Sequence, residues 1–311
     1  MFCHLSIGAS ARLLVSALMV MTIAGCQNGP QATTDRADPL TAPDGSTMSY
    51  ETLAATHNER LGQYRTVNAR GNIELRWRDE RGRHFEQGDL DFFLEQPNRT
   101  AFRISKLGEI YFWVGSGDQC IWFFDLSADP RRLTVDSIAA EWAAEEEGAA
   151  FRPLSVLDLM ALSRLPEIGS DRDAPTVYYD DQRDAWRVTV EGQGGPVRLF
   201  FDRATRQPIR AEGLDENGRP MMQSVIGRFR PVDQPTGRAG GVIRPLMPTL
   251  VDIEPMDERV GSMQIKIALG SPTADVDRSV LDRIFDLERL VGSLRPELIE
   301  GEPVCLELIG R

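Results

Sequence analysis

Few residues of this chain are arranged for chemistry at an active site. Of its three histidines, His4 lies in the N-terminal segment, and neither His57 nor His84 has a second histidine at ligand spacing. The HExxH, GxSxG, Walker and dinucleotide-glycine patterns are absent. The carboxylates of Glu145-Glu146-Glu147 follow a predicted helix and are expected to solvate its end. The sequence therefore predicts no metal, no cofactor and no enzyme. A paired-carboxylate hydrolase stays open as the alternative, because its acids can be remote in the chain.

The charge balance excludes one class of partner. Asp and Glu number 47 against 35 Lys and Arg, which gives a net charge of −12. Binding to a phosphate backbone needs clustered cations, so no nucleic-acid partner is predicted. Hydrophobic residues make up 41% of the chain and charged residues 26%. These are ordinary values for a globular protein, and they exclude both wholesale disorder and a polytopic membrane protein.

Cys26 stands in surroundings that predict a covalent modification. It follows Ile23-Ala24-Gly25, at the end of an apolar run over residues 13–24. That run is too short to span a bilayer but has the length of a signal-peptide core. The pattern resembles the lipobox of bacterial lipoproteins. The resemblance implies that residues 1–25 are a signal peptide removed before Cys26, and that Cys26 carries acyl chains. The alternative is an ordinary secretory signal cut near Gly25.

The residues after Cys26 predict a tether and a location. Residues 27–48 are rich in Pro, Gly, Thr, Asp and Ala, so 26–48 are expected to form a lipidated cysteine and flexible linker. Such a linker spans roughly 25 Å. Gln27 stands where an Asp would resemble an inner-membrane retention signal. This favours a lipid anchor in the outer membrane of a bacterial envelope, on the periplasmic face.

The body of the chain predicts one helix, many strands and further helices. Residues 49–63 have apolar residues at helical spacing, and residues 67–77 alternate with period two. Further strands are expected at 90–94, 101–105, 110–114, 120–124, 176–179, 185–191, 197–202, 208–214, 221–229, 249–254 and 262–268, with helices at 137–147, 153–164 and 278–285. This order predicts an α+β fold with a large curved antiparallel sheet. The strands at 110–114 and 120–124 are apolar on both faces, so each face must meet protein or a ligand.

Three groups of residues resemble the LolA/LolB-like bacterial lipoprotein-carrier superfamily, over about 50–287. They are Gly88–Asp91 with Leu94–Pro97 and Phe102-Arg103, the turn and aromatic strand at 116–125, and Pro245–Ile253 with Ile265, Ile267 and 283–285. The resemblance implies an incomplete, half-open β-barrel with helices on its concave side. The half-barrel domain is expected at 49–290, followed by a C-terminal tail at 291–311.

In that family the concave cavity takes acyl chains. Strand phase then predicts the side chains along the inner surface, which are Leu90, Phe92, Phe102, Ile104, Tyr111, Trp113, Ile121 and Phe123. For the two doubly apolar strands the phase is open, because Phe112, Trp122 and Phe124 could equally face inward. A solid core without a cavity is the alternative. Leu107 occupies the place of a membrane-contacting leucine in LolB proteins, although Lys106 replaces the usual proline.

These resemblances predict a non-enzymatic, membrane-anchored protein that binds an acyl chain or other lipidic ligand, in lipid or lipoprotein transfer. The alternative is an envelope sensor or scaffold that binds a protein partner with the same fold. The mature chain would keep Cys120 and Cys305 in an oxidising compartment. A disulfide between them is one expectation, and a free buried thiol at Cys120 is the other.

Overall fold

The computed structural model describes residues 40–79, 82–97, 99–138, 153–168, 174–192, 195–233, 245–257, 262–274 and 276–310. The expected signal peptide, Cys26 and the helix predicted at 137–147, apart from its first two residues, lie outside these residues.

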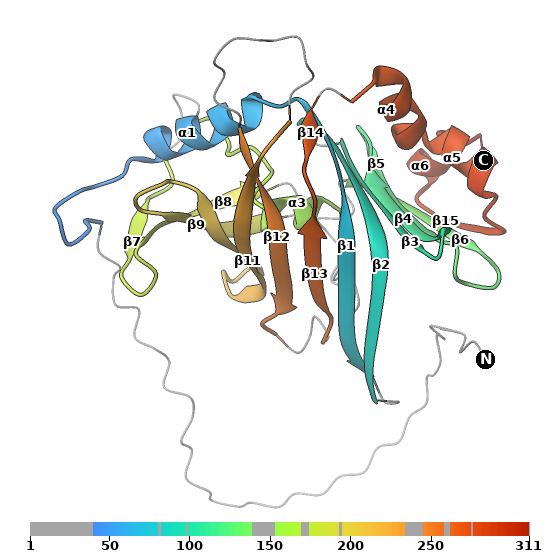
Figure 1. The fold of residues 1–311 in the computed structure, drawn as a ribbon, viewed down its shortest axis with the longest axis horizontal. Helices are drawn as coiled ribbons and strands as arrows, with labels where there is room; N and C mark the ends of the chain where they lie inside the picture. The colour runs from blue at the N-terminus through green and yellow to red at the C-terminus, as the bar shows by residue number, and fades with distance from the viewer. Residues whose placement is uncertain are drawn as a thin grey trace, which may run out of the picture.

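The described strands form one 15-stranded sheet in the order β15-β6-β5-β4-β3-β2-β1-β13-β12-β11-β10-β9-β8-β7, with β14 beside β1 (Figure 1). Neighbouring strands are antiparallel except β15, which runs parallel to β6. Their bounds are β1 Thr66–Asp79, β2 Gly82–Glu95, β3 Arg99–Lys106, β4 Glu109–Ser116, β5 Cys120–Asp125, β6 Arg132–Ser137, β7 Tyr178–Asp180, β8 Ala185–Gly192, β9 Gly195–Asp202, β10 Pro208–Leu214, β11 Pro220–Pro231, β12 Leu246–Pro255, β13 Gln264–Leu269, β14 Thr273–Ala274 and β15 Leu298–Gly301.

The helices are α1 (Tyr50–Gly62), α3 (Pro153–Leu159), α4 (Arg278–Phe285), α5 (Leu287–Leu294) and α6 (Pro303–Glu307). Ser49 caps α1 by accepting from the Thr52 amide. Asp277 and Asp286 cap α4 and α5 in the same way. Each cap satisfies an amide that the first helical turn leaves without a partner.

The sheet curves around α3. This helix contacts β3 and β4 on one side and β9 and β10 on the other, although five strands separate β3 from β10 in the sheet. Only a strongly bent sheet brings both groups to one helix. Among the described strands, β15 and β7 at the two ends of the sheet are not paired with each other, so the sheet forms an incomplete barrel (Figure 1). The α+β half-barrel with helical cover on its concave side is therefore confirmed.

Two apolar clusters lie on opposite faces of the sheet. The inner cluster joins the concave face to α1, α3 and the residues after α3. The outer cluster joins the other face of β2–β6 to α4, α5 and α6. Strands β3 to β5 thus contribute side chains to an apolar cluster on each face, which explains why two of them are apolar throughout.

The structure differs from the sequence-based elements at several places, among them β2, which begins at Gly82 rather than at residue 90, the helix expected over 153–164 and the C-terminal residues. The helix expected over 153–164 ends at Leu159, since Ala161 has a positive φ of 50° and the chain turns there. The segment expected as a C-terminal tail at 291–311 contains the end of α5, β15 and α6, and β15 extends the sheet at the β6 edge. Short elements such as these lack the length over which periodicity can be recognised.

Candidate functional site

The inner surface of the sheet is the candidate site, and most of it is apolar. On β2 and β3, Leu90, Phe92 and Phe102 are at most 1% exposed, and Ile104 is 8% exposed. The Phe92 and Phe102 rings pack at 5.2 Å between centroids. The second half of the sheet contributes equally apolar side chains, which include Val188, Val190, Leu199, Phe201, Ile253 and Ile265.

The end of α3 and the residues after it fill the concave side. We call residues 156–166 the plug. Val156, Leu157, Met160 and Leu162 of the plug are at most 1% exposed and belong to the inner cluster. Each such side chain stabilises the fold by about 1.5–3 kcal/mol through burial. The inner surface near α3 is therefore a packed core in this structure.

Polar side chains of α1 hold the plug through its backbone. The Tyr50 hydroxyl donates to the Pro166 carbonyl at 2.8 Å. The Asn58 amide group both donates to the Leu165 carbonyl and accepts from the Leu165 N–H, each at 2.9 Å. From the sheet, Gln96 donates to the Leu162 carbonyl at 3.2 Å and Ser224 donates to the Leu159 carbonyl at 2.5 Å. These hydrogen bonds satisfy backbone carbonyls at the end of α3 and after it, where the regular helical hydrogen bonds stop.

His57 lies at the centre of this contact between α1 and the plug. Its Nε2 lies 2.9 Å from the Ser163 carbonyl, and its Nδ1 lies 3.0 Å from Nη2 of Arg60. Because the guanidinium can only donate, Nδ1 accepts and Nε2 donates to the carbonyl. Burial, and then the Arg60 charge, lower the pKa of His57 to about 3, which keeps the ring neutral at neutral pH.

The contact between α1 and the plug leaves several buried polar atoms without a hydrogen bond. Within the described residues, Nε and Nη1 of Arg60, the Tyr64 hydroxyl, Oε1 of Gln96 and Oγ of Ser163 are buried without a hydrogen-bond partner. Buried groups of this kind cost free energy. The contact between α1 and the plug is therefore less stable than its apolar burial alone indicates.

An aromatic pair lies open on the inner surface of β4 and β5. The Phe112 and Phe123 rings stack at 5.7 Å between centroids. Phe123 is 37% exposed, whereas Phe112 packs partly against the inner cluster. Ile121, also expected on the inner surface, lies two residues before Phe123 and belongs to the same cluster. The plug thus covers most of the inner surface but leaves this pair in contact with solvent.

The structure places Trp113 on the opposite face from the one that strand phase predicted. Its side chain belongs to the outer cluster with Trp122 and Phe124, and the Arg103 guanidinium lies 5.7 Å from its ring centroid. Tyr111 is half-buried and outside both clusters. Phase could not be read on these strands because both of their faces are apolar.

The outer layer also contains the cysteine pair. A disulfide joins Cys120 of β5 to Cys305 of α6, with 6.0 Å between their Cα atoms. Both residues are at most 3% exposed. Together with the pairing of β15 and β6, this bond holds residues 298–310 against the half-barrel.

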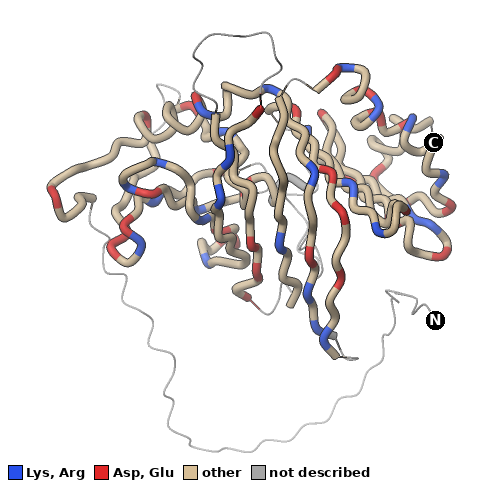
Figure 2. Tube along the Cα trace, in the orientation of Figure 1, with Lys and Arg blue, Asp and Glu red and all other residues tan. Residues whose placement is uncertain are grey.

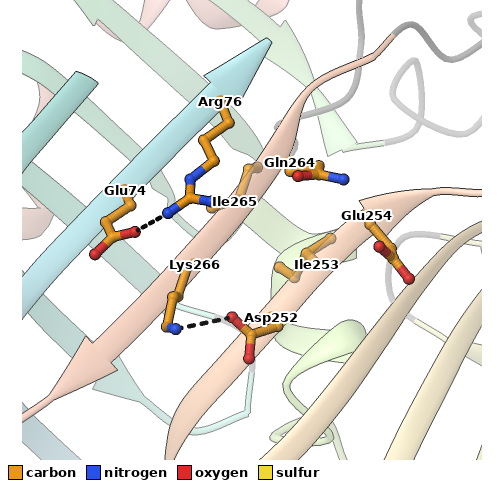
Figure 3. A pocket seen from close by; sticks show the side chains of 8 residues that line it. All are labelled: Glu74, Arg76, Asp252, Ile253, Glu254, Gln264, Ile265 and Lys266. Carbon is orange, nitrogen blue, oxygen red and sulfur yellow. Dashed lines mark hydrogen bonds and ion pairs between the residues drawn. The ribbon is translucent and has the colours of Figure 1, made fainter. Parts of the chain in front are cut away.

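A polar hollow among the described residues lies away from the inner surface. It has a volume of about 240 Å³ between β1, β13 and β12. Figure 3 shows its charged lining, where Glu74 pairs with Arg76 at 3.1 Å and Lys266 with Asp252 at 3.8 Å. A second hollow, beside Asp158 and Ser163 at the plug, holds only about 10 Å³. The first hollow lacks the apolar lining that an acyl chain requires, and the second is too small for one.

Comparison with known proteins finds structures of similar fold but no match to a family model or to a curated protein. No family model matches the sequence, and no curated protein matches it. A DUF1329 family protein from Desulfovibrio piger superposes with a TM-score of 0.50 at 13% identity, over 78% of this chain and 97% of the other. A putative outer membrane lipoprotein-sorting protein domain from Vibrio parahaemolyticus gives 0.48 at 8% identity, over 76% and 96%. A LolA superfamily protein from Nitrosomonas europaea gives 0.43 at 12% identity, over 77% and 98%.

The chain shares its fold with the Desulfovibrio piger protein. At these identities the likeness concerns the fold alone. Within the described residues of the half-barrel, no group of His, Cys, Asp and Glu is placed to hold a metal ion. None of its described helices is long and apolar enough to cross a membrane.

Leu107 lies at a hairpin tip of the half-barrel. It is 94% exposed, and it forms the two-residue turn between β3 and β4 with Gly108. Both residues have positive φ, 55° and 85°, as the tightest hairpin turns require. A leucine is unfavourable in this conformation and gains nothing from exposure to water.

Sequence reasoning missed the side chains that hold the plug. Tyr50, Asn58 and Gln96 all bind backbone carbonyls, which every residue type carries, so no pattern in the sequence could indicate their partners. The inner residues of β8 to β13 were detectable, because they alternate with polar residues in the same way as those of β1.

Proposed function

We propose that this protein is a membrane-anchored lipoprotein of the bacterial envelope that binds an acyl chain or other lipidic ligand on the inner surface of its half-barrel. The observation that carries the proposal is the stacked pair Phe112–Phe123, which extends the apolar inner surface into solvent beside the plug. An acyl chain that starts at this pair would continue along the inner surface by displacing the plug. No catalytic step is needed, because apolar contact supplies the affinity.

Displacement of the plug is energetically plausible for a ligand of this kind. Each hydrogen bond between α1 and the plug stabilises the closed form by about 1 kcal/mol. The unsatisfied atoms of Arg60, Tyr64 and Ser163 offset part of that stabilisation. An acyl chain gains about 0.8 kcal/mol for each methylene that it buries, so a long chain is able to replace the apolar contacts of the plug.

The test of this function is binding of a fluorescent fatty-acid probe. The Phe123→Glu variant should bind the probe at least tenfold more weakly, because a charge at the open aromatic pair opposes entry of an alkyl chain. Val225→Glu is the matched control, since Val225 is 52% exposed on β11, remote from the aromatic pair in the sheet, and points to the outer face. Equal loss in both variants, or no binding by the wild type, would refute acyl binding on the inner surface.

The filled inner surface favours one second function. A half-barrel whose plug stays closed would act as an envelope sensor or scaffold that binds a protein partner. Mass spectrometry of gently purified protein separates the two functions: a carrier is expected to co-purify with lipid, and a scaffold is not.

The proposed anchor is Cys26, with Leu107 as a second membrane contact. Replacing Cys26 with alanine should give a protein without acyl mass that a high-salt wash releases from membranes, because two or three acyl chains are what holds the wild type. Membrane retention that is unchanged in this variant, together with no acyl mass on the wild type, would contradict lipidation.

A further inference from the structure

The hairpin of β1 and β2 extends beyond the rest of the sheet. The two strands pair residue for residue from Thr66↔Glu95 to Asp79↔Gly82. Among the described strands, however, β13 reaches β1 only as far as Arg76, and β3 reaches β2 only as far as Asp89. Figure 1 shows the hairpin reaching past the neighbouring strands. We call residues 76–79 and 82–85 the arm.

The arm carries two arginines in an arrangement that is unfavourable within the protein. Arg78 and Arg83 are directly opposite each other in the ladder, and both are exposed. Like charges in this position repel. Neither side chain has an acidic partner among the described residues, while the backbone of Arg78 bonds Ser262. An anionic partner would remove this repulsion.

Aromatic rings accompany these cations. Phe85 is 54% exposed, and the Arg76 guanidinium lies 5.4 Å from its ring centroid. On the other face of the arm Trp77 and His84 stack at 5.0 Å between centroids. Leu107, on the adjoining hairpin, is the most exposed large apolar residue of the described chain, and Lys106 beside it pairs with Glu86 of β2 at 2.6 Å.

The charge of this region differs from that of the whole chain. Residues 76–85 contain four arginines and two acids, a balance of +2 in a protein of −12. Glu80 and Arg81 are counted from the sequence, since they lie outside the described residues. Figure 2 shows Lys and Arg gathered towards the end of this hairpin. A positive end on an acidic molecule orients it towards an anionic surface.

We propose that the arm docks the protein onto an anionic phospholipid surface. Arginine and aromatic side chains together are suited to the headgroup region, where the rings lie at the interface and the guanidinium groups reach phosphates. An acidic protein would satisfy the arginines but would leave Phe85 and Leu107 without an apolar environment. The inference rests on the membrane location in the proposed function, and it does not depend on acyl binding at the inner surface.

Vesicle flotation tests this proposal with a chain that begins at residue 27. This chain lacks Cys26 and keeps every described residue, so binding is measured without the anchor. The wild type should bind phosphatidylcholine vesicles containing 30 mol% phosphatidylglycerol at least tenfold more tightly than vesicles of phosphatidylcholine alone. High salt should weaken that binding. The Arg78→Glu/Arg83→Glu variant should lose at least tenfold of the affinity for the anionic vesicles.

Arg283→Glu/Arg289→Glu is the matched control, because it changes the net charge equally at exposed positions on α4 and α5. It should bind anionic vesicles nearly as well as the wild type. Equal loss in both double variants, wild-type binding by the arm variant, or no vesicle binding by the wild type would overturn the proposal. Competition by millimolar inorganic phosphate would also overturn it, since that result indicates a site for the free anion. The fluorescent fatty-acid probe is tested on the same chain in solution, without vesicles. A failure of acyl binding is therefore distinguished from a failure of vesicle binding.

Discussion

The Phe102→Glu variant is expected to unfold, or to melt far below the wild type. Phe102 is 0% exposed at the middle of the inner surface, with its ring against Phe92. A glutamate there would bury a carboxylate among apolar side chains, at a cost of several kcal/mol. Typical domains have only about 5–15 kcal/mol of stability. Circular dichroism with thermal melting measures the effect.

Val225→Glu is the control for this experiment as well, because the same charge at an exposed site on the outer face should change the melting temperature only slightly. A Phe102→Glu protein that melts close to the wild type would mean that water reaches the middle of the inner surface. The plug would then be displaced in solution, and the surface would be an open cleft rather than a core.

The second large effect is expected from the Cys120→Ala/Cys305→Ala variant. The disulfide links residues 185 positions apart, so it removes much conformational entropy from the unfolded chain. Chain-entropy arguments give about 5 kcal/mol for such a loop, and losses of about 2–5 kcal/mol are usual when native bonds are removed. Urea denaturation should show a lower midpoint, and reduction of the wild type should reproduce the shift.

Intact-mass measurement checks the bond directly. The chain from residue 27 contains Cys120 and Cys305 as its only cysteines. Alkylation in denaturant without reductant should add no alkyl group to it. Two added groups would show that the thiols are free, and the stability loss of the alanine variant would then reflect only lost packing.

Several features of the fold were predictable because they depend on local pattern. The alternation over 67–77 predicts one apolar face, and the structure places Val67, Ala69 and Ile73 in the inner cluster. Leu90, Phe92, Phe102 and Ile104 likewise lie on the inner surface, because strands with one polar face have a readable phase. The lipobox at Cys26 is a prediction of the same local kind, and it stays a prediction.

Tertiary structure alone decided the features that depend on two distant segments. Ile121 belongs to the inner cluster, beside the plug, and Trp113 belongs to the outer cluster, beside α4–α6. When both faces of a strand are apolar, the sequence does not indicate which face packs against which layer. The contact of His57 with Ser163 was equally unreadable, because its acceptor is a backbone carbonyl. Sequence periodicity determined that this chain builds a curved sheet with an apolar inner surface. Packing between distant segments decided that a plug, held by α1, fills that surface.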